Sequence, residues 1–346
     1  MIILQLYILL DLSTLEKYDL QKMYKVYDRW PELSRQVYES EIESANLGEF
    51  NHIIFAGMGG SGAIGDIFSS ILSKSKIHVS VVKGYHLPST VNSETLIVTT
   101  SISGNTVETL VTLDEARKKG SKIISFFSGG KMEEYCHKHN IVYRKIAQEH
   151  SPRASFTKFL YSMISTLDST IPLKSKDVLE SISKLEKTRE VISSSNLVSS
   201  ENTALDLAEW LNKIPLIYYP FGLQAVAIRF KNSLQENAKS HAMAEDVIES
   251  SHNGIVSWER ESNIQPILVE GQDDYIKTKE RWQILKCFFK ENNIEYKEII
   301  SENGNILTKI VNLIYLLDYS TIFKAVLDEI DPSPVKSIDF IKSKLN

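Results

Sequence analysis

The sequence predicts an α/β fold made of two three-layer αβα units that repeat one plan. Short β-branched apolar runs alternate with amphipathic stretches of helical length, which is typical of βαβ units. The runs are continuously apolar rather than alternating, and this favours strands buried on both faces of a parallel sheet. Residues 51–66 and 213–239 each carry the pattern of a short strand, a glycine-bearing turn and a helix. We therefore interpret the chain as a pseudo-duplication.

The elements follow in order along the chain. A polar stretch over residues 14–45 predicts a helical opening. Strands of the first unit are expected at residues 52–56, 77–82, 95–99, 122–126 and 141–143. A helical segment with Ser- and Lys-rich turns follows, and strands of the second unit are expected at residues 214–219, 267–269 and 296–300, with a long helix ending near Lys239.

This order of elements predicts four segments. It also predicts helices near the C-terminus, one of which includes the apolar residues 310–317. The segments are an N-terminal extension and helix (1–50), a first subdomain (51–150), a helical linker (151–212) and a second subdomain with a C-terminal tail (213–346).

Composition excludes several classes of protein. The 346 residues include 39 Lys and Arg against 44 Asp and Glu, so no basic excess favours nucleic acid as a partner. Cys136 and Cys287 are too few for a disulfide framework, and we expect free thiols in the cytoplasm. The apolar run over residues 1–10 is too short to span a membrane, which takes about 20 residues, and it lacks the features of a signal peptide. We expect no membrane partner.

The first candidate site is the glycine-rich loop Gly-Met-Gly-Gly-Ser-Gly over residues 57–62, between a strand and a helix. Glycines there allow close approach of the backbone, and helix-terminal amides attract anions. A tight turn that packs a helix closely is the alternative interpretation. NAD is disfavoured, because the next strand leads to Lys83 rather than to a ribose-binding acid. The loop also lacks the Lys-Ser/Thr ending of a nucleotide P-loop.

The second candidate is the loop Thr-Ser-Ile-Ser-Gly-Asn-Thr over residues 100–106, again between a strand and a helix. Ser101, Ser103 and Thr106 place three hydroxyls around one helix N-terminus, which suits a small phosphate. A capping box from Asn105 and Glu108 is the alternative. One cap needs one hydroxyl, so three hydroxyls favour phosphate.

Together these two loops resemble the sugar isomerase (SIS) fold, whose members bind phosphosugars through them. The resemblance implies that both units are SIS-type subdomains. Further stretches resemble the bifunctional phosphoglucose/phosphomannose isomerases of archaea and some bacteria, in the family's order from about Tyr18 to the C-terminus. They are Val-Lys-Gly-Tyr-His-Leu-Pro (82–88), Ser-Pro-Arg (151–153), Gln-Glu-Asn-Ala-Lys (235–239), His-Asn-Gly-Ile-Val-Ser-Trp (252–258) and Asp-Pro-Ser-Pro-Val (331–335).

The resemblance assigns a role to each matching residue. It implies that Glu236 is the base that moves a proton between C2 and C1, and that Arg153 stabilises the cis-enediolate. His252 matches a ring-opening histidine contributed by the neighbouring subunit, and Lys342 a C-terminal lysine near the same oxygens. The resemblance also makes Ser333 a candidate for epimer selectivity, because its hydroxyl lies in the matching tail stretch. The residues expected to hold the sugar phosphate are Gly59, Gly60, Ser61, Ser101, Ser103 and Thr106.

The resemblance also implies a homodimer, no organic cofactor and no metal. Residues 136–139, Cys-His-Lys-His, form the one cluster that hints at a metal. Helical spacing places Cys136 and His139 on one face and turns His137 away, so only two ligands converge. We expect a solvated helix end there.

The expected function is interconversion of glucose 6-phosphate and fructose 6-phosphate, and of mannose 6-phosphate and fructose 6-phosphate. Two alternatives stay open. One is another SIS isomerase, of the arabinose 5-phosphate or glucosamine 6-phosphate type. The other is a noncatalytic phosphosugar sensor, although the acidic chain shows no basic DNA-binding segment.

Overall fold

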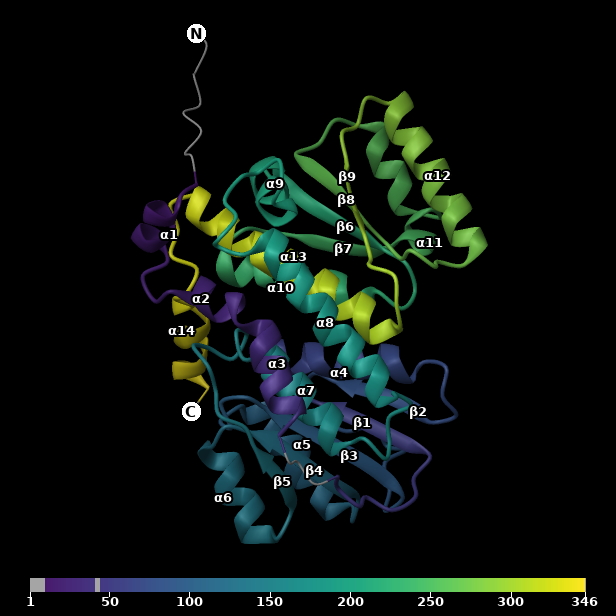
Figure 1. The fold of residues 1–346 in the computed structure, drawn as a ribbon. Coiled ribbons are helices and arrows are strands. Elements are labelled where there is room, and N and C mark those ends of the chain that lie inside the picture. The colour runs from purple at the N-terminus through teal and green to yellow at the C-terminus, as the bar shows by residue number, and fades with distance from the viewer. Residues whose placement is uncertain (1–9, 41–43, 346) are drawn as a thin grey trace.

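The computed structural model describes residues 10–40 and 44–345, which build two parallel β-sheets with helices between and outside them (Figure 1). The N-terminal apolar run therefore lies outside the described residues except for its last member, Leu10.

The first sheet contains five parallel strands: β1 (His52–Ala56), β2 (His78–Val82), β3 (Thr95–Ser101), β4 (Lys122–Phe127) and β5 (Val142–Lys145). Their order across the sheet is β2-β1-β3-β4-β5. Every residue of β1 and β3 is buried, as in the centre of a sheet covered on both faces. Because the order reverses between β1 and β3, the crevice at their carboxyl ends is the expected place for a ligand. Helices flanking the sheet are α4 (Gly59–Leu72) on one face and α5 (Val107–Lys118) and α6 (Gly130–His139) on the other.

The second sheet repeats this plan with β6 (Ile214–Tyr219), β7 (Met243–Asp246), β8 (Ile264–Glu270) and β9 (Lys297–Ile300), in the order β7-β6-β8-β9. The predicted pseudo-duplication of parallel α/β subdomains is confirmed. Strand β7 was not predicted, because its sequence Met-Ala-Glu-Asp is polar and its edge position leaves it partly exposed. The outer elements are α11 (Val247–Ser250), the 3-10 helix η1 (Gly254–Glu259) and α12 (Ile276–Glu291).

A layer of helices lies between the two sheets and is shared by them (Figure 1). One hydrophobic cluster runs from Ile53 and Phe55 of β1 through these helices to Ile217 of β6 and Ile267 of β8. Residues 151–212, expected to be a helical linker, supply three helices of this layer; the segment boundaries stay a prediction. Besides α4, the layer contains α3 (Trp30–Tyr38), α7 (Phe156–Thr166), α8 (Ser175–Ile192), α9 (Thr203–Trp210), α10 (Gln224–Asn237) and α13 (Ile306–Leu327).

The helical opening expected over residues 14–45 is present as three short helices. The segment forms α1 (Leu12–Tyr18), α2 (Met23–Asp28) and α3, because Lys22 adopts a left-handed φ of 57° and Pro31 starts a new helix. The helices also contribute to the core, since Tyr27 and Trp30 are fully buried against α13 and α7. The chain ends in α14 (Lys336–Lys344), none of whose residues is buried.

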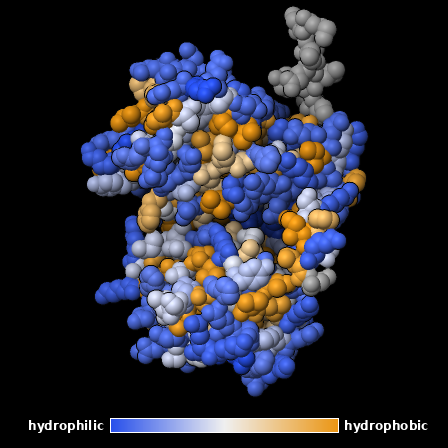
Figure 2. All heavy atoms as spheres, turned by 180° about the vertical axis from the view of Figure 1, so that it is seen from behind, coloured by the Kyte–Doolittle hydropathy of each residue, from blue (hydrophilic) through white to orange (hydrophobic). Residues whose placement is uncertain are grey.

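Helix α13 is the one helix in the described part of the chain that is long and apolar enough to cross a membrane, but 83% of its apolar window is buried in the fold. It packs against α8, α9 and α10, so its apolarity is that of a core helix. Seen from behind, hydrophilic residues cover most of the surface and hydrophobic residues form smaller areas between them (Figure 2).

Candidate active site

The first of the two loops expected to bind phosphate connects β1 to α4 and lies against the end of β3. A Cβ atom at Gly57 would lie 2.8 Å from the carbonyl oxygen of Thr100, so only glycine allows this approach. Ser61 Oγ accepts a hydrogen bond of 3.3 Å from the amide of Ile102 and thereby joins the first loop to the second. The N-cap residue of α4, Met58, offers no side-chain cap. The amides of Ser61 and Gly62 donate to the carbonyl oxygen of Met58 at 3.0 and 3.2 Å, so the amides of Gly59 and Gly60 are the ones available to an anion.

The second loop connects β3 to α5 and is built in the same way. Thr106 is the N-cap of α5, but its hydroxyl caps no amide and lies 2.9 Å from Ser101 Oγ. The capping alternative is therefore not what the structure adopts. Ser103 Oγ accepts a long hydrogen bond of 3.4 Å from the amide of Asn105 and is partly exposed. Gly104 has a φ of +70°, and a Cβ there would lie 1.6 Å from the carbonyl oxygen of Gly129, so the loop after β4 braces this loop.

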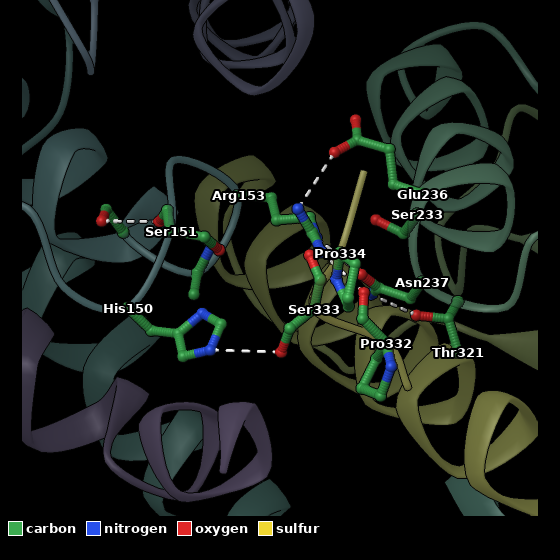
Figure 3. Close-up of polar contacts among 12 residues, drawn as sticks. His150, Ser151, Arg153, Ser233, Glu236, Asn237, Thr321, Pro332, Ser333 and Pro334 are labelled. Carbon is green, nitrogen blue, oxygen red and sulfur yellow. Dashed lines mark hydrogen bonds and ion pairs between the residues drawn. The ribbon is translucent and has the colours of Figure 1, made fainter. Parts of the chain in front are cut away.

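Arg153 and Glu236 meet beside the first loop, although 82 residues lie between them in the sequence. Arg153 Nε donates to Asn237 Oδ1 at 2.6 Å, and Nη2 donates to the carbonyl oxygens of Pro332 and Ser333 at 2.7 and 2.8 Å. The remaining nitrogen, Nη1, lies 3.5 Å from Glu236 Oε2 (Figure 3). The side chain of Arg153 is 7% exposed and that of Glu236 27%. A Cβ at Gly60 would lie 3.7 Å from the Cα of Arg153, which places this pair next to the phosphate loops.

A buried ion pair between Arg229 and Asp318 lies next to the backbone of Arg153. Arg229 donates from Nε and Nη2 to Asp318 Oδ2 at 2.9 and 2.6 Å, and from Nη2 to the carbonyl oxygen of Arg153 at 3.0 Å. Ser233 Oγ donates to the other carboxylate oxygen at 2.7 Å. Burial raises the pKa of Asp318, and Arg229 opposes that shift. Sequence reasoning missed Arg229, although it lies two helical turns before Glu236 on the same helix.

Lys239 is a further residue to which the sequence assigned no role, although it ends the matched stretch at 235–239. It follows α10 with a left-handed φ of 56°, and its Nζ donates to the carbonyl oxygens of Pro332 and Pro334 at 3.3 and 2.8 Å. Partial burial, followed by the charge of Arg153, lowers the pKa of its amine to about 8. Arg153 and Lys239 therefore both donate hydrogen bonds to residues 332–334, and these bonds hold the segment that contains Ser333.

Ser333 itself is 8% exposed and lies between Arg153 and His150 (Figure 3). Its Oγ is 3.2 Å from His150 Nε2. His150 was not predicted as a site residue, and the available signal was its position immediately before the Ser-Pro-Arg stretch.

Two predicted site residues are not brought to this cluster by the fold. His252 follows α11 and is exposed, and Lys342 belongs to α14 and is exposed. Helix α11 is at the right of Figure 1 and α14 at the left. Neither side chain has a hydrogen bond or ion pair to Glu236 or Arg153 in the described residues.

No group of three or more His, Cys, Asp or Glu within residues 10–40 and 44–345 is arranged to hold a metal ion. Cys136 is buried in the cluster around Phe127 and Met132, whereas His137 is exposed and its Nε2 lies 3.0 Å from the hydroxyl of Tyr143.

Comparison with known families matches both halves of the chain. Residues 47–172 match the SIS domain, and residues 200–345 match the bacterial phospho-glucose isomerase C-terminal SIS domain.

Two curated relatives match over most of their lengths. A protein of Caldicellulosiruptor bescii named bifunctional phosphoglucose/phosphomannose isomerase is 32% identical over 94% of this chain and 96% of its own length. One of Thermoplasma acidophilum with the same name is 29% identical over 88% of this chain and 92% of its own. Among solved structures, one described as a putative tagatose-6-phosphate ketose/aldose isomerase from Clostridium novyi aligns with a TM-score of 0.69 at 15% identity, over 93% of this chain and 92% of that one. This last likeness concerns the fold alone.

Proposed function

The chain belongs to the family of bifunctional phosphoglucose/phosphomannose isomerases, and from this premise we propose that it interconverts glucose 6-phosphate and mannose 6-phosphate with fructose 6-phosphate. The observation that carries the proposal is the contact of 3.5 Å between Arg153 Nη1 and Glu236 Oε2, next to two helix N-termini without side-chain caps. A carboxylate, a cation and an anion site are the groups that aldose–ketose isomerisation of a sugar phosphate requires.

The phosphate group would bind at the start of α4 and α5. The amide of Gly60 and the hydroxyls of Ser61, Ser101, Ser103 and Thr106 supply donors there, and Gly59 has the left-handed φ of 53° that opens the turn. Binding energy at this remote group helps to hold C1 and C2 at the catalytic residues.

Glu236 would remove the proton from C2 and return it to C1, which leaves the number of atoms and electrons unchanged. The intermediate is a cis-enediolate, whose negative charge lies on oxygen. Arg153 has three hydrogen bonds that fix its guanidinium before substrate arrives, so stabilising that charge requires little reorganisation.

Replacing Glu236 by Gln tests the assignment of the base. We expect E236Q to lower kcat by about 100-fold or more in both directions while fructose 6-phosphate still raises the melting temperature. Glu209, exposed on α9, provides the matched control as E209Q. The assay follows glucose 6-phosphate and mannose 6-phosphate separately from fructose 6-phosphate, with EDTA present. Unchanged turnover in E236Q contradicts the role of Glu236.

The same assay separates the alternatives. Binding of fructose 6-phosphate without either product supports a noncatalytic sensor. Turnover of arabinose 5-phosphate or glucosamine 6-phosphate instead supports another SIS isomerase.

We further propose a homodimer in the cytoplasm, in which His252 of each subunit opens the sugar ring in the partner's site. The exposure of His252, away from Glu236 of its own subunit, supports this arrangement. Mixing inactive E236Q and H252N subunits then restores about a quarter of wild-type activity, because half of the dimers are mixed and each has one intact site. No recovery after subunit exchange contradicts a shared site. Lys342 stays a proposed neighbour of the sugar oxygens, and K342M is expected to lower kcat.

A further inference from the structure

Ser333 has a partner for each of its polar groups. Its amide donates to Asp331 Oδ1 at 2.9 Å, and its carbonyl oxygen accepts from Arg153 Nη2 at 2.8 Å. Its hydroxyl oxygen lies 3.2 Å from His150 Nε2. The backbone of Ser333 is therefore fixed on both sides, and the partner that decides where its hydroxyl proton points is His150.

The loop that carries Arg153 also carries His150. Ser155 Oγ braces this loop, since it donates to the carbonyl oxygen of Ser151 and accepts from the amide of Glu149, both at 2.9 Å. His150 and Arg153 consequently contact Ser333 from the same turn. The imidazole of His150 lies at the hydroxyl of Ser333, and the guanidinium of Arg153 lies at its carbonyl oxygen (Figure 3).

The ring of His150 is neutral near neutral pH. Burial lowers its pKa, the charge of Arg153 lowers it further, and Asp331 opposes the shift. A neutral ring has one N–H. Nδ1 is buried and has no hydrogen-bond partner in the part of the chain that the structure describes, so a proton there would be an unpaired buried donor. A proton on Nε2 instead donates to Ser333 Oγ, which is the cheaper arrangement.

We propose that His150 is a positioning residue that holds the Ser333 hydroxyl as a hydrogen-bond donor at the reacting end of the sugar and thereby sets the relative turnover of the two C2 epimers. With Nε2–H donating to Oγ, the hydroxyl proton of Ser333 is free to donate to an oxygen of the substrate. The inference rests on the proposed function.

The position of Ser333 explains why epimers would be distinguished there. Glucose 6-phosphate and mannose 6-phosphate differ only in configuration at C2, the carbon from which Glu236 would take a proton. Discrimination therefore depends on groups close to Glu236. The guanidinium of Arg153 connects the two residues, since Nη2 binds the carbonyl oxygen of Ser333 and Nη1 faces Glu236.

The test is the ratio of initial rates of mannose 6-phosphate and glucose 6-phosphate formation from fructose 6-phosphate, with kcat and KM for each epimer. We expect H150L and S333A to shift this ratio by about 3- to 10-fold in the same direction, the effect of one hydrogen bond. The double variant H150L/S333A shifts it no further than S333A does, because both changes remove one interaction. H150Q places an amide nitrogen near the position of Nε2 and keeps the ratio within about twofold of wild type.

His137 provides the matched control, since its Nε2 also lies close to a hydroxyl, that of Tyr143 at 3.0 Å, on the outer helix α6. H137L should leave the ratio unchanged. An equal fall in kcat/KM for both epimers in H150L, or effects of H150L and S333A that multiply, overturns the inference and leaves His150 a structural residue. If H150L does not fold, H150N takes its place, because its shorter amide does not reach Ser333. Formation of neither product by the wild-type protein refutes the proposed function rather than the role of His150.

Discussion

The two α/β subdomains share one strand order but line the same crevice with different side chains. In the first, the loops after β1 and β3 leave the N-termini of α4 and α5 without side-chain caps and surround them with hydroxyls. In the second, the equivalent loop after β8 contains Asp274. Its Oδ2 accepts from the amide of Gly271 at 3.0 Å and from Trp282 Nε1 at 2.9 Å.

The N-termini of α10 and α12 also lack side-chain caps, so the subdomains differ in the side chains next to these helices. The first places hydroxyls there, and the second places the carboxylate of Asp274, whose negative charge disfavours an anion. The second subdomain contributes Glu236 to the candidate site, and it does so from the C-terminal end of a helix, since Glu236 lies in the last turn of α10. Repetition of a fold therefore does not repeat a site, and we propose that the side chains in the strand-to-helix loops determine which copy binds phosphate.

The largest expected effect comes from the tight packing of the loops in the first subdomain. G104A forces a Cβ to within 1.6 Å of the carbonyl oxygen of Gly129 at a φ of +70°, and we expect a loss of about 4 kcal/mol or more, or no folding. G120A has the same φ but open space around it, and costs about 1–2 kcal/mol.

G222A makes the corresponding change in the loop after β6, where φ is +95° and no atom lies within 4 Å of the added Cβ. Urea unfolding of the three variants measures the difference. Equal losses in G104A and G222A would show that the two subdomains do not differ in this respect.

The next largest effect concerns the buried ion pair between Arg229 of α10 and Asp318 of α13 in the shared helical layer. R229M leaves Asp318 buried without its cation and should cost about 3–5 kcal/mol in the free energy of unfolding. The double variant R229M/D318L replaces the pair by apolar groups and should recover most of that loss. It does not restore the donor to the carbonyl oxygen of Arg153, so kcat stays low.

Chemical denaturation and steady-state kinetics on the same samples separate the two effects. Full recovery of kcat in the double variant would show that Arg229 contributes to stability alone.

The strands and the strand-to-helix loops of this comparison could be predicted from the sequence, because both depend on patterns of neighbouring residues. Buried strands such as β1 follow from β-branched runs, and the phosphate loops follow from glycine and hydroxyl residues next to a strand. Strand β7 and the contact between Arg153 and Glu236 follow from tertiary packing, which brings distant segments together and has no local pattern. His150 was missed for the same reason, since its partner Ser333 is 183 residues away.

A smaller effect tests which subdomain binds phosphate. S101A removes one hydroxyl beside Thr106, and we expect the KM for fructose 6-phosphate to rise by about tenfold with kcat changed less, because phosphate binding is remote from C1 and C2. The matched change in the second subdomain is D274N, for which KM should stay at the wild-type value. A rise in KM in D274N, with none in S101A, would assign the phosphate to the other crevice.

The smallest effect is a pH dependence that belongs to the second subdomain alone. Burial raises the pKa of Asp274 above its usual value of 3.8, and hydrogen bonds from Trp282 and Gly271 only partly oppose this. In the pH range just above 3.8 the folded protein then holds more protons than the unfolded chain, so stability falls as pH rises through that range. The free energy of unfolding of the wild type relative to D274N should therefore decrease as pH rises from 3.8 through the raised pKa of Asp274. Subtracting the variant cancels the other carboxylates, because distant sites contribute additively. An increase instead would mean that the hydrogen bonds from Trp282 and Gly271 outweigh burial.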